Sequence, residues 1–210
     1  MKGGHRKKAH TPLARSELPI DTAELARFLI GKLLVRELQE GVASGRIVET
    51  EAYVIGDAAG HAFAGMTPRN RALFLERGHA YVYLAYGVSW MLNVSSEAPG
   101  IGAGVLIRAL EPLEGVALMQ RNRGSERLRD LGRGPGRLAE ALRIDRSLDG
   151  LDLCQEGPLW LARDDHEPGE IGKGEIGKSV RIGISKDAHR VLRFYLRRSP
   201  FVSGAKSLNE

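Results

Sequence analysis

The sequence predicts a single domain of mixed α and β structure, in the broad α/β class and of the α+β type. A chain of 210 residues is long enough to bury one sizeable core, and no linker divides it. Several segments alternate apolar and polar residues as strands do, and others carry apolar residues at helical spacing. Segments of both kinds therefore have to pack around one core.

The domain is expected to span residues 17–206, after a disordered basic arm at residues 1–16. The arm is polar and aperiodic. It holds five Lys or Arg side chains and no acidic residue, so its charge of +5 equals the formal net charge of the whole chain. Asp21 then resembles an N-cap, with Glu24 three residues later. Apolar residues at helical spacing follow, so we expect a helix over residues 22–31.

Two strands and a turn between them are predicted next. Residues 33–35 form a short apolar run typical of a buried strand. Residues 41–45 begin and end with glycine and predict a turn. Residues 46–53 alternate in polarity and predict the second strand.

The acidic side chains of the second strand are the first candidates for chemistry. Side chains alternate along a strand, so Glu49, Glu51 and Tyr53 should share one face. Ile47 should lie on the same face, and burial beside apolar surface raises the pKa of a glutamate and makes it a better proton acceptor. A pair of solvated glutamates is the simpler interpretation of the alternation alone.

A loop and a short helix follow this strand. Residues 57–65 are mostly small and carry His61. A lone histidine in a loop is usually a surface or hydrogen-bonding residue. Thr67 followed by Pro68 predicts the N-cap and first residue of a short helix that ends near Leu75.

Residues 79–95 predict a β-hairpin rich in aromatic side chains. Tyr81 and Tyr83 should share one face of its first strand. The turn is expected at residues 86–89, which places Tyr86 near the tip. A core tyrosine would be out of place there, and exposed aromatic residues at such tips often make contacts.

The rest of the chain predicts three more strands and one helix. We expect the strands at residues 105–110, 180–184 and 191–196. Pro135 can begin a helix, because leucines follow it at helical spacing. These segments make the chain rich in strands.

Basic residues outside the arm are concentrated in two segments. Residues 121–146 hold eight arginines against four acidic residues, and residues 179–206 hold seven basic residues against one acidic residue. Basic segments on an otherwise neutral body suit a polyanion that binds one face. Solvated surface arginines without a partner explain the same charges equally well.

We expect no metal and no cofactor. Cys154 is the single cysteine, which excludes an internal disulfide and suits a reducing cytosol. The six histidines show none of the short spacings typical of zinc ligands. No apolar run reaches the length of a membrane span, so the expected location is the cytoplasm, and the expected oligomeric state is a monomer.

One motif suggests nucleotide binding and has a simpler explanation. Residues 172–179 match the phosphate-loop pattern G-x-x-x-x-G-K-[ST], which works only between a strand and the N-terminus of a helix. Here a strand pattern follows the match. The match also lies in a tandem repeat, residues 169–173 and 174–178, so we interpret the segment as a flexible surface loop and not as an ATP site.

Six motifs together resemble a family of DNA repair enzymes. They are R-I-V-E-T-E-A-Y at 46–53, T-P-R-N-R at 67–71, Y-V-Y and Y-G within 81–87, R-A-L-E-P-L at 108–113, G-P-G at 134–136 and R-F-Y at 193–195. In this order they closely resemble the alkyladenine, or 3-methyladenine, DNA glycosylase family. The resemblance implies a curved antiparallel β-sheet with surrounding helices and a protruding β-hairpin.

The resemblance also implies which residues act. By position, Glu51 would be the general base that activates a water for attack on the sugar C1′ of a flipped nucleotide, and Arg108 would help to hold that water or a nearby phosphate. Tyr53 and Tyr83 would stack against the base. Tyr86 would fill the gap left in the duplex as an intercalating wedge.

Three further residues complete the implied pocket. His61 would form part of the wall, and its main chain would bind the base edge. Tyr81 would steady the His61 ring, and Asn93 would crowd the pocket against the exocyclic amine of guanine. The loop before His61 is short here and has Gly60 next to the histidine.

The implied partner is double-stranded DNA that contains damaged purines. Aromatic stacking returns about 1–3 kcal/mol per base, which offsets much of the cost of extruding a nucleotide. Stacking favours electron-poor rings such as alkylated purines, whereas a neutral lesion such as hypoxanthine needs protonation as it leaves. No lysine lies in the tyrosine-rich strands, so water is the expected nucleophile and no lyase step is expected.

Two other functions fit parts of the sequence. Glu49 and Glu51 lie about 6.6 Å apart by strand rise, which suits a two-carboxylate hydrolase of nucleosides or other glycosides. Such an enzyme would not need Tyr86 at a hairpin tip or the arginine-rich segments. A non-catalytic module that recognises damaged DNA would also explain the basic segments.

Overall fold

The fold is organised around one long strand, β2 (Gly41–Tyr53), which pairs with neighbours along both edges. One edge pairs with β5 (Gly104–Glu114). The other edge pairs with β1 (Leu33–Leu38) over its first half and with β8 (Arg193–Leu196) further along. All these pairings are antiparallel, so β2 lies inside the sheet along most of its length.

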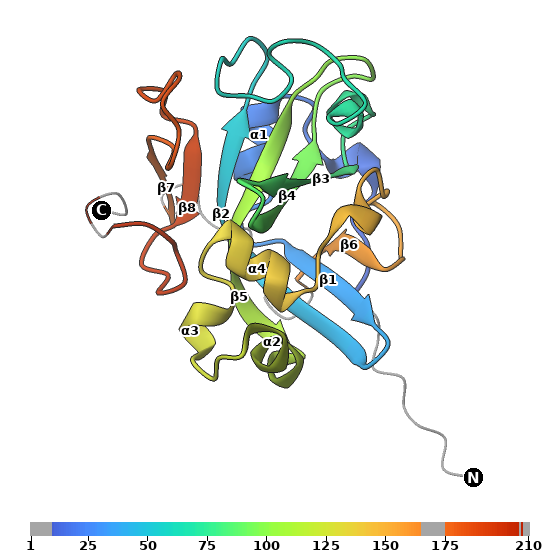
Figure 1. Cartoon of the computed structure of the whole chain (residues 1–210), viewed down its shortest axis with the longest axis vertical. Coiled ribbons are helices and arrows are strands. Elements are labelled where there is room, and N and C mark those ends of the chain that lie inside the picture. Colours follow the sequence, from blue (N-terminus) through green and yellow to red (C-terminus); the bar gives the residue numbers. More distant parts are fainter. Residues whose placement is uncertain (1–9, 165–174, 206, 208–210) are drawn as a thin grey trace.

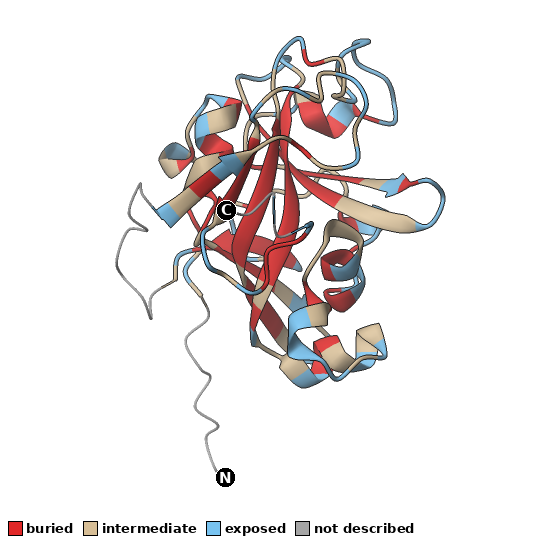
Figure 2. Ribbon diagram, turned by 90° about the vertical axis from the view of Figure 1, so that its left-hand side faces the viewer, coloured by how far each residue is buried: buried red, intermediate tan, exposed pale blue. Residues whose placement is uncertain are grey.

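The sheet continues on both sides of this centre in the order β3-β4-β5-β2-β1-β6. β4 (Ser89–Ser95) pairs with β5 and forms the predicted hairpin with β3 (Ala80–Ala85). β6 (Leu159–Ala162) pairs with β1, and β7 (Ile176–Ser179) pairs with β8. The sheet curls into a half-barrel from which the hairpin protrudes, which confirms the predicted fold class (Figures 1 and 2).

The structure, a computed structural model, describes residues 10–164, 175–205 and 207. These residues include four α-helices: α1 (Thr22–Phe28), α2 (Val116–Arg123), α3 (Leu128–Leu131) and α4 (Pro135–Ala141). The described residues also include three short 3₁₀ helices: η1 (Arg15–Glu17), η2 (Arg71–Phe74) and η3 (Arg146–Leu148). Among the described residues no helix is long and apolar enough to span a membrane.

The main core lies between the curled sheet and the helices. α1 packs against β2 and β5, while α2, α3 and α4 gather near one end of β5 (Figure 1). Figure 2 shows that the buried residues follow the strands of the sheet. The hydroxyl of Thr50 donates a hydrogen bond of 2.8 Å to the carbonyl of Ala26, which ties α1 to β2.

The N-terminal part of the chain differs from the prediction in two places. Asp21 caps α1 as predicted, but the helix ends at Phe28 because Gly31, with φ of 87°, turns the chain into β1. Residues 10–16, which we expected in the disordered arm, are folded, because Leu13 is buried and its N–H bonds to the carbonyl of Leu161. Residues 1–9 lie outside the described residues.

The predicted turn at residues 41–45 is wrong, because these residues are the first part of β2. They pair with β1, and the turn lies at residues 39–40 instead. The glycine at position 45 serves close packing, since a Cβ there would lie 3.0 Å from the carbonyl oxygen of Glu111 on β5. Glycine in this strand therefore marks a close approach of two backbones.

A β-bulge changes which side chains of β2 share a face, so the predicted faces are partly wrong. The register between β2 and β5 shifts twice between Ile47 and Thr50, with Val48 as an extra residue on β2 and Arg108 as an extra residue on β5, and Val48 reverses the alternation along β2. Ile47 consequently packs in the main core, whereas Val48 packs with the C-terminal residues Tyr195 and Phe201. Glu49 and Glu51 do not have Ile47 beside them, and both are fully buried, so the solvated-pair interpretation is also wrong.

The remaining differences concern loops and strand ends. The helix expected from Thr67 begins only at Arg71, because Thr67 and Asn70 bond to each other in a turn. No strand covers residues 180–184, since the pairing with β8 ends at Ser179. Residues 176–178 of the tandem repeat, which we expected in a loop, belong to the strand β7. Residues 165–174 lie outside the described part.

Substitution of Gly177 by alanine should loosen β7 from β8. A Cβ at this position would overlap the ring of Tyr195, which is buried and pairs with Glu49. Overpacking of this kind costs about 1–3 kcal/mol, so urea denaturation should show a lower free energy of unfolding. Gly157→Ala is the matched control, because no heavy atom lies within 4 Å of its Cβ position. Equal stability of the two variants would contradict this packing.

Candidate functional site

A cavity of about 670 Å³ opens between the loop after β2, the β3–β4 hairpin and the segment after β7. Most residues predicted for the site line it: Tyr53, His61, Tyr81, Tyr83, Tyr86, Asn93 and Arg108. Glu51 does not line the cavity. Its carboxylate lies behind the wall, bound to groups that do line it.

Three rings form the aromatic wall of the cavity. Tyr81 and Tyr83 lie two residues apart and therefore share one face of β3, and their rings stack with centroids 5.4 Å apart. The ring of His61 lies edge-on to Tyr83, with centroids 4.3 Å apart, and shares a hydrogen bond of 2.9 Å with the Tyr81 hydroxyl. Partial removal of the ring from water and the nearby Arg69 lower the pKa of His61, which favours the neutral ring.

The loop that carries His61 is fixed by an asparagine that sequence reasoning did not single out. The side-chain amide of Asn70 donates hydrogen bonds to the carbonyls of His61 and Gly65, at 2.8 and 3.0 Å. Asn93 lies across the cavity on β4, where its amide donates to the carbonyl of Tyr81 at 3.3 Å. The bond from Asn70 occupies the His61 carbonyl.

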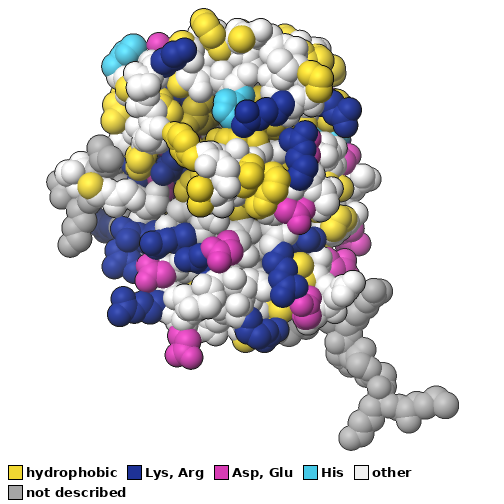
Figure 3. Space-filling view, in the orientation of Figure 1, with side chains coloured by type: hydrophobic (Ala, Val, Ile, Leu, Met, Phe, Trp, Pro, Cys, Tyr) yellow, Lys and Arg dark blue, Asp and Glu magenta, His cyan; other side chains and the backbone are white. Residues whose placement is uncertain are grey.

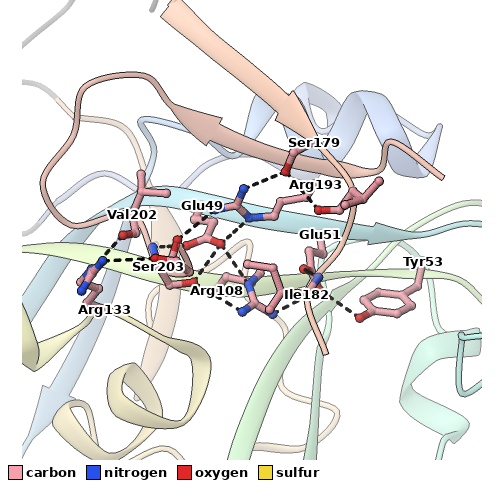
Figure 4. A network of polar contacts seen from close by, with 12 residues as sticks. Glu49, Glu51, Tyr53, Arg108, Arg133, Ser179, Ile182, Arg193, Val202 and Ser203 are labelled. Carbon is pink, nitrogen blue, oxygen red and sulfur yellow. Dashed lines mark hydrogen bonds and ion pairs between the residues drawn. The ribbon is translucent and has the colours of Figure 1, made fainter. Parts of the chain in front are cut away.

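Glu51 is held by three donors (Figure 4). The backbone N–H of Ile182 donates to Oε1 at 2.7 Å, and the hydroxyl of Tyr53 donates to Oε2 at 3.0 Å. The guanidinium of Arg108 lies 3.3 Å from Oε2. Burial raises the pKa of Glu51, and Arg108 opposes that rise without cancelling it. Glu51 is therefore more basic than an ordinary glutamate.

Glu49 has the opposite electrostatic environment. Its Oε1 accepts hydrogen bonds from the Nε atoms of Arg108 and Arg193, at 3.0 and 2.7 Å, and from the Ser203 hydroxyl at 2.9 Å. The backbone N–H of Ser203 donates to Oε2 at 2.6 Å. Burial alone would raise the pKa of Glu49, but the two guanidinium groups outweigh it and hold the pKa below its usual range. Glu49 stays ionised and cannot donate a proton.

The ring of Tyr53 rests on a buried ion pair. The guanidinium of Arg181 lies 4.6 Å from the ring centroid and forms an ion pair with Asp57. Arg181 also donates to the carbonyl of Ala52 at 3.0 Å, so it joins the end of β2, the following loop and the segment after β7. Its neighbour Ile182 holds Glu51. This short segment fixes both the aromatic wall and the carboxylate behind it.

The hairpin tip places Tyr86 in solvent. Tyr86 is 94% exposed, and its neighbour Val88 is 82% exposed. Tyr86 and Gly87 have φ of 52° and 71°, and the N–H of Val88 bonds to the carbonyl of Ala85, which is the geometry of a type I′ turn. Two large exposed apolar side chains therefore project from the edge of the cavity.

Basic side chains occupy the same face as the cavity. In the face that Figure 3 shows, hydrophobic side chains are concentrated in the upper and middle parts, while Lys and Arg side chains are frequent in the lower part and also occur in the upper part. Exposed arginines come from the segment that includes α2, α3 and α4: Arg121, Arg127, Arg129, Arg137, Arg143 and Arg146. Within the described residues, Arg121 and Arg127 form no ion pair with an acidic side chain. The lower part of this face can attract a polyanion.

Sequence reasoning missed several residues that hold the site. They are Asp57, Asn70, Arg181, Arg193 and Ser203. One signal could have found the two arginines, because each stands alone in an otherwise apolar run that predicts a buried strand. Ile182 acts through its backbone, for which the sequence carries no signal. Among the described residues, no group of three or more His, Cys, Asp or Glu side chains could hold a metal ion.

The chain is similar to one family of proteins along most of its length. The profile of the family described as "Methylpurine-DNA glycosylase (MPG)" matches residues 16–200. A protein of Mesorhizobium japonicum is 76% identical over 205 residues, which cover 98% of this chain and 96% of that protein. Proteins of Paraburkholderia phytofirmans and Methanoculleus marisnigri are 53% and 45% identical, and cover 94% and 87% of this chain and 90% and 94% of their own lengths. All three are named "Putative 3-methyladenine DNA glycosylase".

Proposed function

The chain belongs to the methylpurine-DNA glycosylase family, an enzyme family of base excision repair, and on that premise we propose how its site works. The enzyme flips a damaged purine, alkylated at N3 or deaminated to hypoxanthine, out of duplex DNA. It then hydrolyses the N-glycosyl bond with a water activated by Glu51 and leaves an abasic site. The observation that carries this proposal is a carboxylate of raised pKa held directly behind an aromatic cavity.

The cavity would take the flipped base. Tyr53 and Tyr83 have ring surfaces on the cavity and would stack against a purine, with a gain of about 1–3 kcal/mol per base. The amide N–H of His61 would bind the base edge, because the His61 carbonyl is already occupied by Asn70. Asn93 would stand where a guanine amine has to fit. These roles extend the family assignment to single residues.

Glu51 would act as the general base. Its carboxylate is fully buried, so the nucleophilic water has to reach it between Tyr53, Arg108 and Ile182, each of which has atoms on the cavity. Arg108 contacts Glu51 and lines the cavity, so it can hold that water. A raised pKa makes Glu51 a stronger acceptor for the proton of the water. The base leaves as the water attacks C1′.

The duplex would lie across the face that carries Tyr86 and the exposed arginines. Extrusion of one nucleotide leaves a gap in the stack, and Tyr86, which is 94% exposed at the hairpin tip, would fill it. The arginines around α2, α3 and α4 would contact phosphates, which makes affinity fall as salt rises. The basic segments of an otherwise neutral chain fit this role.

The two-carboxylate hydrolase is the weaker proposal. Its second carboxylate has to reach the sugar or the attacking water, whereas Glu49 is fully buried, does not line the cavity and is held by Arg108 and Arg193. A hydrolase of free nucleosides would release base from inosine as fast as from a duplex, without dependence on salt. A non-catalytic module would bind damaged DNA and release no base.

Glu51→Gln should abolish base release while DNA binding persists. The amide keeps the shape of the side chain but cannot take a proton, so single-turnover excision should fall by at least about 100-fold. The assay uses a duplex with one hypoxanthine or alkylated purine, and alkali then cleaves the abasic sites. Affinity for the same duplex should stay within a few-fold of the wild type.

Glu156→Gln is the matched control, because Glu156 is exposed and far in sequence from the site. It should excise at the wild-type rate. Full activity of Glu51→Gln would overturn the general-base role. If the wild-type protein binds the lesion duplex but releases no base, the result would favour the non-catalytic module.

Tyr86→Ala should weaken binding to a lesion duplex by about 5- to 100-fold, because one stacking contact is worth about 1–3 kcal/mol. Fluorescence anisotropy with and without a lesion measures the effect. Ile20→Ala is the control, since Ile20 is another exposed apolar side chain and lies before α1. Equal affinity of Tyr86→Ala and wild type would count against the wedge.

Borohydride should trap no covalent complex with abasic DNA. A lyase forms a Schiff base through an amine, and Lys186 is the lysine among the described residues that line the cavity. Wild-type protein and Lys186→Ala should therefore give the same result, with no adduct on a denaturing gel. An adduct that Lys186→Ala removes would show that an amine, and not only water, attacks the sugar.

A further inference from the structure

Glu49 belongs to the site but does not line the cavity. It is fully buried, and its contacts come from three separate parts of the chain: Arg108 on β5, Arg193 on β8 and Ser203 near the C-terminus. A buried carboxylate with this many charged and polar donors is costly to build. The role of Glu49 has to explain why the charge is kept there.

Arg108 links Glu49 to Glu51. Its Nε donates to Glu49 at 3.0 Å, and its Nη1 lies 3.3 Å from Glu51. A guanidinium group is planar and rigid, so a partner that fixes Nε also fixes the direction of Nη1. The hydroxyl of Ser203 lies 3.4 Å from Nη2 and also bonds to Glu49, which closes the arrangement.

The charged and titratable side chains that act on Glu51 are Glu49 and Tyr53 from β2, Tyr83 from β3 and Arg108 from β5. Next to them, Arg193 from β8 pairs with Glu49, and Arg181 from the segment after β7 pairs with Asp57 from the loop after β2. Three guanidinium groups face three carboxylates, including Glu51 itself, so the ionised cluster is neutral. Loss of the Glu49 charge would leave an excess positive charge beside Glu51.

We propose that Glu49 is a positioning residue for base excision: it orients Arg108 toward Glu51 and shares the charge of Arg108, so that Glu51 remains basic enough to activate water. This inference rests on the proposed role of Glu51 as the general base. Glu49 itself touches neither the substrate nor the water. It acts only through Arg108 and through its own charge.

Glu49→Gln separates this role from a merely structural one. The amide removes the negative charge, so the excess positive charge should favour ionised Glu51 and move the acidic midpoint of the pH–rate profile to lower pH by about one unit. A base weaker by about one pKa unit should also lower the plateau rate, by up to about 10-fold. Single-turnover excision from a hypoxanthine duplex measures both, and duplex affinity should stay within a few-fold.

Glu49→Asp is the second variant, because it keeps the charge and shortens the reach to Arg108. Its midpoint should stay at the wild-type pH while its plateau rate falls, and circular dichroism confirms that both variants fold. A wild-type midpoint in folded Glu49→Gln overturns the charge role. A wild-type plateau in Glu49→Asp overturns the positioning role, and this variant decides the matter if Glu49→Gln does not fold.

The failure of this inference can be told apart from failure of the proposed function. If Glu51→Gln loses excision while both Glu49 variants behave as wild type, only the role of Glu49 is wrong. If Glu51→Gln keeps excision, the general base is wrong and the role of Glu49 falls with it. Glu156→Gln again serves as the exposed control, with an unchanged midpoint and plateau.

Discussion

Carboxylates and guanidinium groups meet around the second half of β2, where water reaches almost none of them. A charge taken out of water costs several kcal/mol unless an opposite charge and hydrogen bonds replace the lost solvation. The partners of β2 therefore have to arrive from distant parts of the chain, and β5, β8 and the residues around Ser203 supply them. The C-terminal segment returns to β2, where Ser203 binds Glu49.

The same cluster gives two neighbouring glutamates different chemical characters. Glu49 contacts two guanidinium groups, which lower its pKa and keep it ionised. Glu51 contacts only one of the two, Arg108, and burial has the larger effect and raises its pKa. Their spacing along the strand is that of any two residues on one face. Environment, and not sequence separation, decides which of the two carboxylates can accept a proton.

Local patterns predicted the parts of the fold that depend on local physics. The cap at Asp21, the β3–β4 hairpin with Tyr86 at its tip and the helix that begins at Pro135 were all predicted correctly. Long-range packing decided the rest. A bulge moved Ile47 into the main core, and β-sheet pairing turned a glycine-bounded segment into a strand, because neither depends on residues nearby in sequence.

The site shows the same division. The aromatic wall could be predicted, since alternation in β3 brings Tyr81 and Tyr83 together and the family resemblance adds His61. The residues that hold Tyr53 and Glu49 could not, because Arg181 and Arg193 come from segments more than a hundred residues away from β2. The contribution of Ile182 is a backbone N–H, which every residue except proline has.

The turn that carries Tyr86 has a consequence for how damage is first met. A side chain other than glycine in the left-handed region costs about 1–2 kcal/mol, and that energy is spent during folding, before any nucleic acid arrives. The backbone position of the ring is thus set before the protein meets DNA, and under the proposed role the ring would press on each base step of an intact duplex in turn. If Tyr86 acts as proposed, weakly stacked nucleotides are extruded most easily. The ease of unstacking then selects nucleotides before the pocket recognises the base itself.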